Sequence, residues 1–307
     1  MKNPDFIHLR ARSTYSLLEG SLHFKQIAEL CHEYNIPAIG LTDSNNLFGA
    51  LEFSEYMATS GIQPIVGCTI NLNFNNDTVD NKAVGVTELS KVCLLAKNNN
   101  GYKNLMKISS NSYNLQNAII PFVNIDYLIK NNEDLIILTG GLEGFIGKDL
   151  LANKNDNAFQ KLKLIKNTFN DRVYIEIQRH LAVGESLIED RQLNMAYDMD
   201  IPIVATNNIF FKTKNDFESN DALRCIAESD YVANENRFRL TSENYFKSPI
   251  DMKELFLDLP EAINNTIEIA IRCIERPMTR DPILPKFTDN IKTNEIYKFN
   301  YHIATNM

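Results

Sequence analysis

The fold of this chain is most constrained by short, almost wholly apolar runs that alternate with longer amphipathic stretches. The runs are rich in Ile, Leu and Val and lack a regular apolar–polar alternation, which is typical of strands buried on both faces. They end within the first 206 residues of a 307-residue chain. The predicted strands are Phe6–Arg10, Ala38–Thr42, Pro64–Ile70, Val92–Ala96, Leu135–Thr139, Val173–Ile177 and Pro202–Thr206.

The stretches between the runs have helical periodicity. In the first of them, Phe24, Ile27 and Leu30 recur at three-residue steps and form one apolar stripe. Strands joined by crossover helices favour a parallel sheet, either closed as a barrel or open and doubly wound. In both cases the functional residues are expected where strands end and helices begin. The predicted helices are Leu22–Tyr34, Leu47–Ser60, Tyr102–Ser110, Ala158–Phe169 and Glu185–Met199.

The last third of the chain has a different pattern. Helical periodicity predicts helices at Asp216–Ser229, Ser248–Leu257 and Pro260–Cys273, and prolines then cluster at positions 277, 282 and 285. We therefore expect residues 1–275 to form one α/β domain, a barrel or an open sheet, with C-terminal helices. Residues 276–307 are expected to form a linker or tail.

Composition narrows the class of protein. With 31 Lys and Arg against 39 Asp and Glu the formal charge is −8, which argues against a broad basic face for nucleic acid but leaves a local basic patch open. No apolar run approaches the roughly 20 residues of a membrane span, and the N-terminus lacks the apolar core of a signal peptide. Five dispersed cysteines, without CxxC spacing, indicate reduced thiols and a cytoplasmic location.

Polar residues at the predicted strand ends form a convergent set. In a barrel, all of these side chains would face one mouth. A metal cluster needs about four to six donors per ion, and arginine has no lone pair to offer. The set therefore disfavours a metal cluster, and His180 is equally compatible with a pocket and with a loop. The candidates are Arg10, Arg12, Glu19, Asp43, Glu176, His180, Asn207 and Asn208.

Other chemistries have little support in the sequence. The glycine-rich stretch from Gly140 to Gly144 lacks the Lys-Ser/Thr of a phosphate-binding loop. No Gly-x-Ser-x-Gly elbow is present, and Cys68 is better explained as a buried thiol than as a nucleophile. Asp43 and Glu176 could form a glycosidase pair, but the nearby arginines would keep both ionised and remove the general acid.

Several motifs, in order, resemble the N-terminal PHP (polymerase and histidinol phosphatase) domain of bacterial replicative polymerase alpha subunits, in its alphaproteobacterial form. The likeness covers residues 5 to about 287. The motifs are Phe6-Ile7-His8-Leu9-Arg10-Ala11-Arg12-Ser13-Thr14-Tyr15-Ser16-Leu17-Leu18-Glu19-Gly20, Gly40-Leu41-Thr42-Asp43, Asn46-Leu47-Phe48-Gly49, Gly61-Ile62-Gln63-Pro64-Ile65-Val66-Gly67-Cys68, Leu94-Leu95-Ala96-Lys97-Asn98, Gly101-Tyr102-Lys103-Asn104-Leu105, Glu176-Ile177-Gln178-Arg179-His180, Pro202-Ile203-Val204-Ala205-Thr206-Asn207 and Tyr245-Phe246-Lys247-Ser248-Pro249.

The resemblance implies a distorted seven-stranded (βα)7 TIM-like barrel, an α/β fold, followed by a short helical extension. It also implies that the metal site is degenerate. Metal-competent members open with His-x-His, where this chain has Arg10 and Arg12. Their Asp-His is here Asp43-Ser44, and the remaining ligand positions fall on Thr69, Lys91 and Asn208 in place of glutamate, histidine and the closing Asp-x-His. We expect no bound metal and no catalytic residue. The remnant pocket would comprise Arg10, Arg12, Glu19, Asp43, Glu176, His180 and Asn208.

The resemblance further implies a function in DNA replication. The parent family is the DNA polymerase III alpha subunit, a DNA-directed DNA polymerase and nucleotidyltransferase whose active site lies in a palm that this chain lacks. We expect a non-catalytic structural and docking domain. Its expected partners are the polymerase core of the same subunit and the proofreading exonuclease subunit, with primed DNA bound only through the full-length polymerase and no membrane.

Two other functions remain open. One is a metal-dependent PHP phosphoesterase or 3′–5′ exonuclease, and the other is a free-standing interaction protein derived from a broken polymerase gene. The physical hypothesis behind the non-catalytic structural role concerns Arg10 and Arg12. Their guanidinium groups can replace divalent cations by pairing with Asp43, Glu19 or Glu176, since unpaired carboxylates in a desolvated site are costly. The alternative is that both arginines point into solvent.

Overall fold

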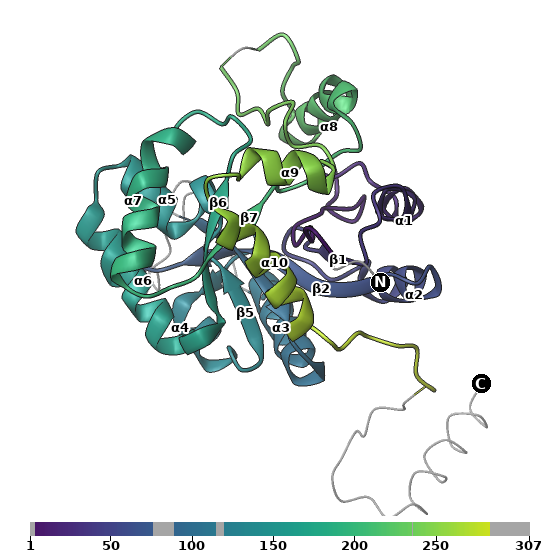
Figure 1. The fold of residues 1–307 in the computed structure, drawn as a ribbon, viewed down its shortest axis with the longest axis horizontal. Helices are drawn as coiled ribbons and strands as arrows, with labels where there is room; N and C mark the ends of the chain where they lie inside the picture. The colour runs from purple at the N-terminus through teal and green to yellow at the C-terminus, as the bar shows by residue number, and fades with distance from the viewer. Residues whose placement is uncertain (1–3, 76–88, 115–119, 235, 283–307) are drawn as a thin grey trace, which may run out of the picture.

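A computed structural model of the chain describes residues 4–75, 89–114, 120–234 and 236–282. Within these ranges, strands from across the chain form one seven-stranded sheet in the order β1-β2-β3-β5-β6-β7, with β4 paired to β2. Figure 1 shows the sheet curling around a centre, with helices on its outside. The strands are β1 (Ala38–Leu41), β2 (Gln63–Asn73), β3 (Ser90–Ala96), β4 (Val123–Asn124), β5 (Leu135–Leu138), β6 (Val173–Gln178) and β7 (Ile203–Thr206).

One strand runs against the others. β3 is antiparallel to both β2 and β5, whereas β1–β2, β5–β6 and β6–β7 are parallel. The expectation of an entirely parallel sheet is therefore wrong at β3. Because β3 is reversed, its first residues, Ser90 and Lys91, lie at the same edge of the sheet as the last residues of its neighbours β2 and β5.

The first predicted strand, Phe6–Arg10, is not a regular strand, but its segment completes the curl of the sheet. Ala11 forms parallel bridges both to Leu41, at the end of β1, and to Ile209, just after β7. Its amide donates to the Gly40 carbonyl at 3.0 Å, while the Arg12 amide donates to the Ile209 carbonyl at 3.0 Å. The N-terminal segment thus fills the gap between the two outer strands and closes the barrel.

The helices follow the amphipathic stretches closely. The predicted helix at Tyr102–Ser110 extends further at both ends, and it begins earlier because Asn98 caps it, accepting a hydrogen bond from the Gly101 amide at 3.0 Å. Short helices within residues 125–151 were not predicted. The α-helices are α1 (Phe24–Glu33), α2 (Ala50–Thr59), α3 (Asn99–Tyr113), α4 (Ile125–Lys130), α5 (Phe145–Leu151), α6 (Asn155–Phe169), α7 (Glu185–Asp198), α8 (Phe217–Glu228), α9 (Pro249–Leu255) and α10 (Pro260–Arg272).

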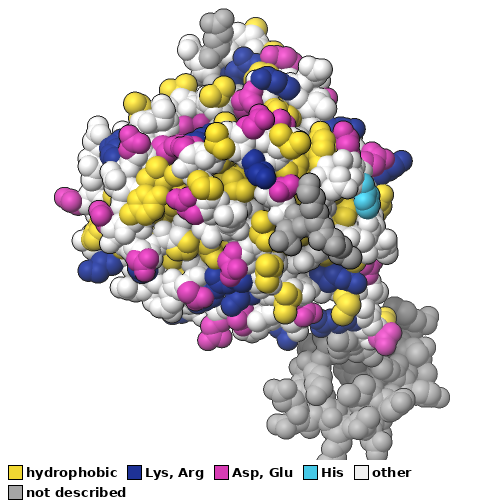
Figure 2. All heavy atoms as spheres, viewed as in Figure 1, with side chains coloured by type: hydrophobic (Ala, Val, Ile, Leu, Met, Phe, Trp, Pro, Cys, Tyr) yellow, Lys and Arg dark blue, Asp and Glu magenta, His cyan; other side chains and the backbone are white. Residues whose placement is uncertain are grey.

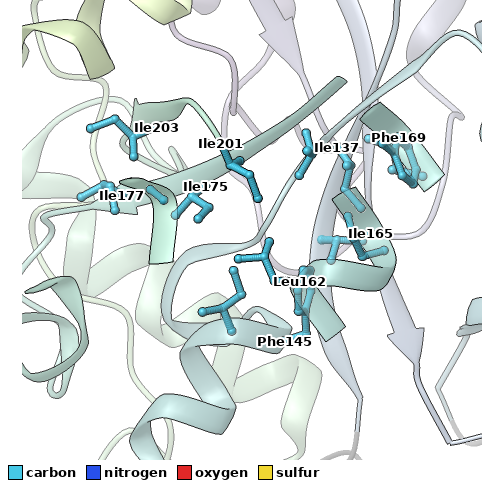
Figure 3. Packing of buried hydrophobic residues seen from close by; sticks show 14 of the residues in the cluster. Ile137, Phe145, Leu162, Ile165, Phe169, Ile175, Ile177, Ile201 and Ile203 are labelled. Atoms are coloured by element: carbon cyan, nitrogen blue, oxygen red, sulfur yellow. The ribbon is translucent and has the colours of Figure 1, made fainter. Parts of the chain in front are cut away.

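The two faces of β3 belong to two apolar cores. Cys93 and Leu95 belong to a first core that also contains buried residues of α1 and α2, whereas Val92 and Leu94 belong to a second core, beneath the helices α3, α5, α6 and α7. Figure 3 shows the second core, where isoleucines of β5, β6 and β7 face Phe145 of α5 and Leu162 of α6. Burial on both faces explains why the strands read as continuous apolar runs.

The prediction of an α/β fold with a seven-stranded, distorted barrel is confirmed, and α9 and α10 form the helical extension. Met252 and Phe256 of the α9 region belong to the core beneath the helices, so the extension packs on the barrel. The boundary between residues 275 and 276 remains a prediction, and residues 283–307 lie outside the described part. Within the described residues, no helix is long and apolar enough to cross a membrane.

Candidate functional site at the strand ends

Two residues far apart in sequence form a buried ion pair at the barrel mouth. Arg10, on the closing segment, places Nη1 at 2.9 and 3.0 Å from the two carboxylate oxygens of Glu176 on β6. Its Nη2 donates to the Thr69 hydroxyl at 3.3 Å. Arg10 is 2% exposed and Glu176 is not exposed at all. The pair joins the N-terminal segment to β6, which lies beyond β7 in the sheet.

The Glu176 carboxylate also accepts hydrogen bonds from its own side of the barrel. The Gly140 amide donates at 2.9 Å, the Gln178 side-chain amide at 2.8 Å, and the Thr206 hydroxyl donates as well. Gly140 has φ of +90°, which a residue with a Cβ adopts only at a cost. Three further donors therefore satisfy the buried Glu176 carboxylate without solvent.

Arg12 occupies a second buried position beside the first pair. Its Nε donates to the Ser44 hydroxyl at 3.1 Å and lies 3.7 Å from a carboxylate oxygen of Glu19. Its Nη1 donates to the Asn208 side chain, and its guanidinium lies 4.4 Å from the centre of the Phe210 ring. Arg12 is 1% exposed, so neither arginine of the first motif points into solvent.

Asp43, at the end of β1, is held by neutral donors. Its carboxylate accepts hydrogen bonds from the Ser13 amide at 2.7 Å, the Ser13 hydroxyl at 2.8 Å and the Ser16 hydroxyl at 2.6 Å. Burial raises the pKa of Asp43, which the hydrogen bonds and the nearby Arg12 charge oppose. Within the described residues no arginine contacts it directly.

His180 is turned away from the arginines. Its Nδ1 lies 2.9 Å from a carboxylate oxygen of Glu185, at the start of α7. The other oxygen of Glu185 accepts a hydrogen bond from the His180 amide at 3.0 Å. The Nε2 atom lies 3.4 Å from the side-chain oxygen of Gln178, so His180 reaches Glu176 only through that residue.

A pair that the sequence analysis did not find lies on the same edge. Lys91, at the start of β3, places Nζ 2.7 Å from the carboxylate of Glu143. Burial alone would raise the pKa of Glu143, but the charges of Lys91, Arg12 and Arg10 together lower it to about 2. Glu143 therefore takes part in the electrostatics of the mouth. A signal for it was available, since it follows the predicted strand end at Thr139.

The residues at the mouth do not fit the metal cluster that the sequence resemblance implies for ligand-bearing members of the family. The first two ligand positions carry guanidinium groups. Arg10 donates hydrogen bonds to both Glu176 oxygens, which a bound cation would need as ligands. The Asp43 oxygens are occupied by serine donors, and a divalent ion here would lie beside two fixed positive charges. The set can neutralise and tie together strand ends, which is a structural task.

A family model described as the PHP domain matches residues 8–180, more than half of the chain. The curated relatives include the DNA polymerase III subunit alpha of Caulobacter vibrioides, 40% identical over 94% of this chain and 25% of the relative. The same subunit of Rickettsia bellii is 38% identical over 96% of this chain and 24% of the relative. The same subunit of Haemophilus influenzae is 32% identical over 95% of this chain and 25% of the relative. The chain thus spans about a quarter of the length of these relatives.

Among solved structures, a putative metal-dependent phosphoesterase from Bifidobacterium adolescentis has a TM-score of 0.42 and 10% identity, over 66% of this chain and 86% of the other. A two-domain protein from Bacteroides vulgatus is described as containing a predicted PHP-like metal-dependent phosphoesterase. It has the same TM-score and identity, over 87% of this chain and 69% of the other.

Proposed function

The chain belongs to the PHP domain family, as the part found in DNA polymerase III alpha subunits, and we propose that it serves replication as a non-catalytic structural and partner-docking domain. The observation that carries the proposal is the buried pair of Arg10 and Glu176. A fixed guanidinium group supplies the positive charge that the carboxylate needs, so the barrel mouth is held together without metal.

The first experiment measures metal in the purified 307-residue chain and its melting temperature with and without a chelator. We expect far less than one transition metal ion per chain and no change in Tm, because the ion pairs replace the cluster. Near-stoichiometric zinc or manganese, or a chelator-sensitive Tm, would contradict the proposal.

The competing function is a metal-dependent phosphoesterase or 3′–5′ exonuclease. Its cheapest assay is hydrolysis of a chromogenic phosphodiester with added Mn²⁺, comparing the chain with Asp43→Ala. We expect no turnover above that of the variant, since the Asp43 oxygens are already satisfied by Ser13 and Ser16. Turnover that Asp43→Ala abolishes would favour the enzyme.

The docking role of the proposed function is supported by apolar side chains left on the surface. Figure 2 shows hydrophobic side chains gathered over α7 and over the α9–α10 region. Tyr197 is 61% exposed, Leu257 81% and Ile271 65%. Exposed apolar groups of this kind are typical of contact surfaces. The partners we propose are the polymerase core of an alpha subunit and the proofreading exonuclease subunit, in the cytoplasm where replication takes place.

This docking proposal can be tested by joining the chain to the remaining three quarters of the Caulobacter vibrioides alpha subunit. Hydrogen exchange should slow at one of the two apolar regions on joining the core, or on adding the exonuclease subunit. Leu257→Ser with Ile271→Ser should weaken the contact if α9 and α10 form it. Unchanged exchange over the whole barrel in both complexes would contradict a docking role.

A further inference from the structure

The surface of α3 differs in charge from the rest of this acidic chain. No Asp or Glu occurs between Leu89 and Ile125, although the chain carries 39 acidic residues. Four lysines fall in the same stretch, at positions 91, 97, 103 and 107, and it is rich in asparagine and serine. A local basic patch was the one kind of nucleic-acid surface that the net charge left open.

The structure gathers part of this stretch into a groove of about 490 Å³ between α3 and the start of α4. Its lining combines lysines and side-chain amides with a tyrosine, and it contains no carboxylate. Figure 1 shows α3 at the lower edge of the barrel, away from α7, α8 and α9. None of the residues that line the groove belongs to α7, α9 or α10. Residues that line it include Asn100, Lys103, Lys107, Asn111, Asn114 and Tyr127.

The two lysines of the groove are available for a ligand. Lys103 and Lys107 are both exposed and are one helical turn apart on the same face of α3. Within the described residues neither forms an ion pair, and Lys107 donates only to the side chain of Asn104, at 3.2 Å. Asn100, which lines the groove, donates a hydrogen bond to the Asp134 carboxylate at 2.9 Å. The positive charge is thus not neutralised internally.

From this arrangement we propose that the α3 groove binds the phosphate backbone of single-stranded DNA. Lys103 and Lys107 contact adjacent phosphates, and Asn100 and Asn111 supply uncharged donors of the kind that contact phosphate and sugar. The half-buried Tyr127 offers a ring on which an unpaired base can stack, which favours single strands over duplex. This goes beyond the expectation that DNA is reached only through a full-length polymerase.

The choice of DNA rests on the proposed function, while the groove itself stands on its own residues. The test is fluorescence anisotropy of the 307-residue chain with a labelled oligothymidylate, in chelator and over a range of salt concentrations. We expect weak binding, with Kd of roughly 10⁻⁴ to 10⁻⁶ M and steep salt dependence. Lys103→Gln with Lys107→Gln should make the negative slope of log K against log salt shallower by about 1.4, for two lost contacts to a single strand.

A matched control separates the groove from net charge. Lys154→Gln with Lys163→Gln removes the same charge from exposed positions at the N-terminus of α6 and within that helix, and should leave binding nearly unchanged. Tyr127→Leu should weaken binding to the single strand and leave binding to duplex unchanged. Circular dichroism checks that each variant is folded.

The proposal is overturned if the chain shows no binding at low salt, if the Lys103 and Lys107 variant binds like the unaltered chain, or if the α6 control loses as much affinity. Because the titrations contain chelator and do not depend on the mouth, their failure would leave the metal and phosphodiester assays to judge the proposed function separately.

Discussion

Nη1 of Arg10 is within hydrogen-bonding distance of both carboxylate oxygens of Glu176, and the two residues are 166 positions apart in the chain. Both side chains are buried. A pair of this kind need not add net stability, because the cost of removing two charges from water can equal their attraction. Removing only one of the two charged side chains is costly, because the other charge then stays buried without a partner.

The first prediction follows from that asymmetry. Arg10→Met should lower the free energy of unfolding by about 3–5 kcal/mol, because the Glu176 carboxylate is left buried without its cation. Arg10→Met with Glu176→Met should recover much of the loss. Urea unfolding measures both, with Lys25→Met as the control, because the Lys25–Glu29 pair is exposed and should contribute under about 1 kcal/mol. Equal losses in the single and double variants would show that the pair is not the source of the effect.

Arg12 should not tolerate lysine. Its guanidinium reaches Ser44 and Asn208 with separate nitrogens and lies over Phe210. A lysine ammonium cannot make these contacts together, so Arg12→Lys should cost about 1–3 kcal/mol in urea unfolding. Arg280→Lys, at an exposed position whose side chain donates no hydrogen bond within the described residues, should change stability by less than about 0.5 kcal/mol. A tolerated lysine at position 12 would mean that charge alone is needed there.

Two glycines with left-handed backbone allow the cost of backbone strain to be measured apart from the cost of a steric clash. At Gly140, φ is +90° and a Cβ would lie 1.8 Å from the Lys91 carbonyl oxygen. At Gly61, φ is +73° and a Cβ would meet nothing within 4 Å. Gly61→Ala should therefore cost about 1 kcal/mol from the backbone alone. Gly140→Ala should cost at least about 2 kcal/mol more, because the loop that donates to Glu176 must move. Similar melting temperatures for the two variants would refute this.

Stability should decrease as the pH is lowered, in a window set by the pKa of His8. Burial lowers the pKa of His8 from 6.5 to about 4. As the pH falls below 6.5 the unfolded chain takes up this proton before the folded chain does. The contribution of His8 to the free energy of unfolding is complete above pH 6.5. It decreases toward pH 4, by about 3 kcal/mol at 1.36 kcal/mol per pKa unit.

The matched variant for this prediction is His8→Gln, which keeps a donor for the Lys247 carbonyl, 2.8 Å from Nε2 of His8, but cannot titrate. Urea unfolding at several pH values should give a flatter profile for the variant between pH 6.5 and 4. Parallel profiles for the two proteins would assign the titration to another group.

The fold was largely predictable because burial on both faces gives each strand a continuous apolar run. Six of the seven predicted strands are regular strands in the structure. The direction of β3 was not predictable from its composition, since Val92 to Ala96 is equally apolar in either direction. The absence of a predicted helix between β2 and β3 was the available signal, because parallel neighbours need a crossover connection.

The site was predictable only in part. The strand-end rule placed Arg10, Arg12, Asp43 and Glu176 at one mouth, and the structure brings them there. It could not assign partners, which depend on loop geometry: Asp43 is held by serines, not by arginine. Glu143 was missed because its glycine-rich loop was considered only as a phosphate cradle.

The double bridge of Ala11 has a consequence for how the protein is made. Its two neighbours, Leu41 and Ile209, leave the ribosome at very different times, since about 200 residues separate Ala11 from Ile209. At about 5–20 residues per second, the first segment to emerge waits roughly 10–40 s for its second neighbour. During translation the nascent barrel therefore has an open seam, and an unpaired edge of this kind can pair with other chains and aggregate.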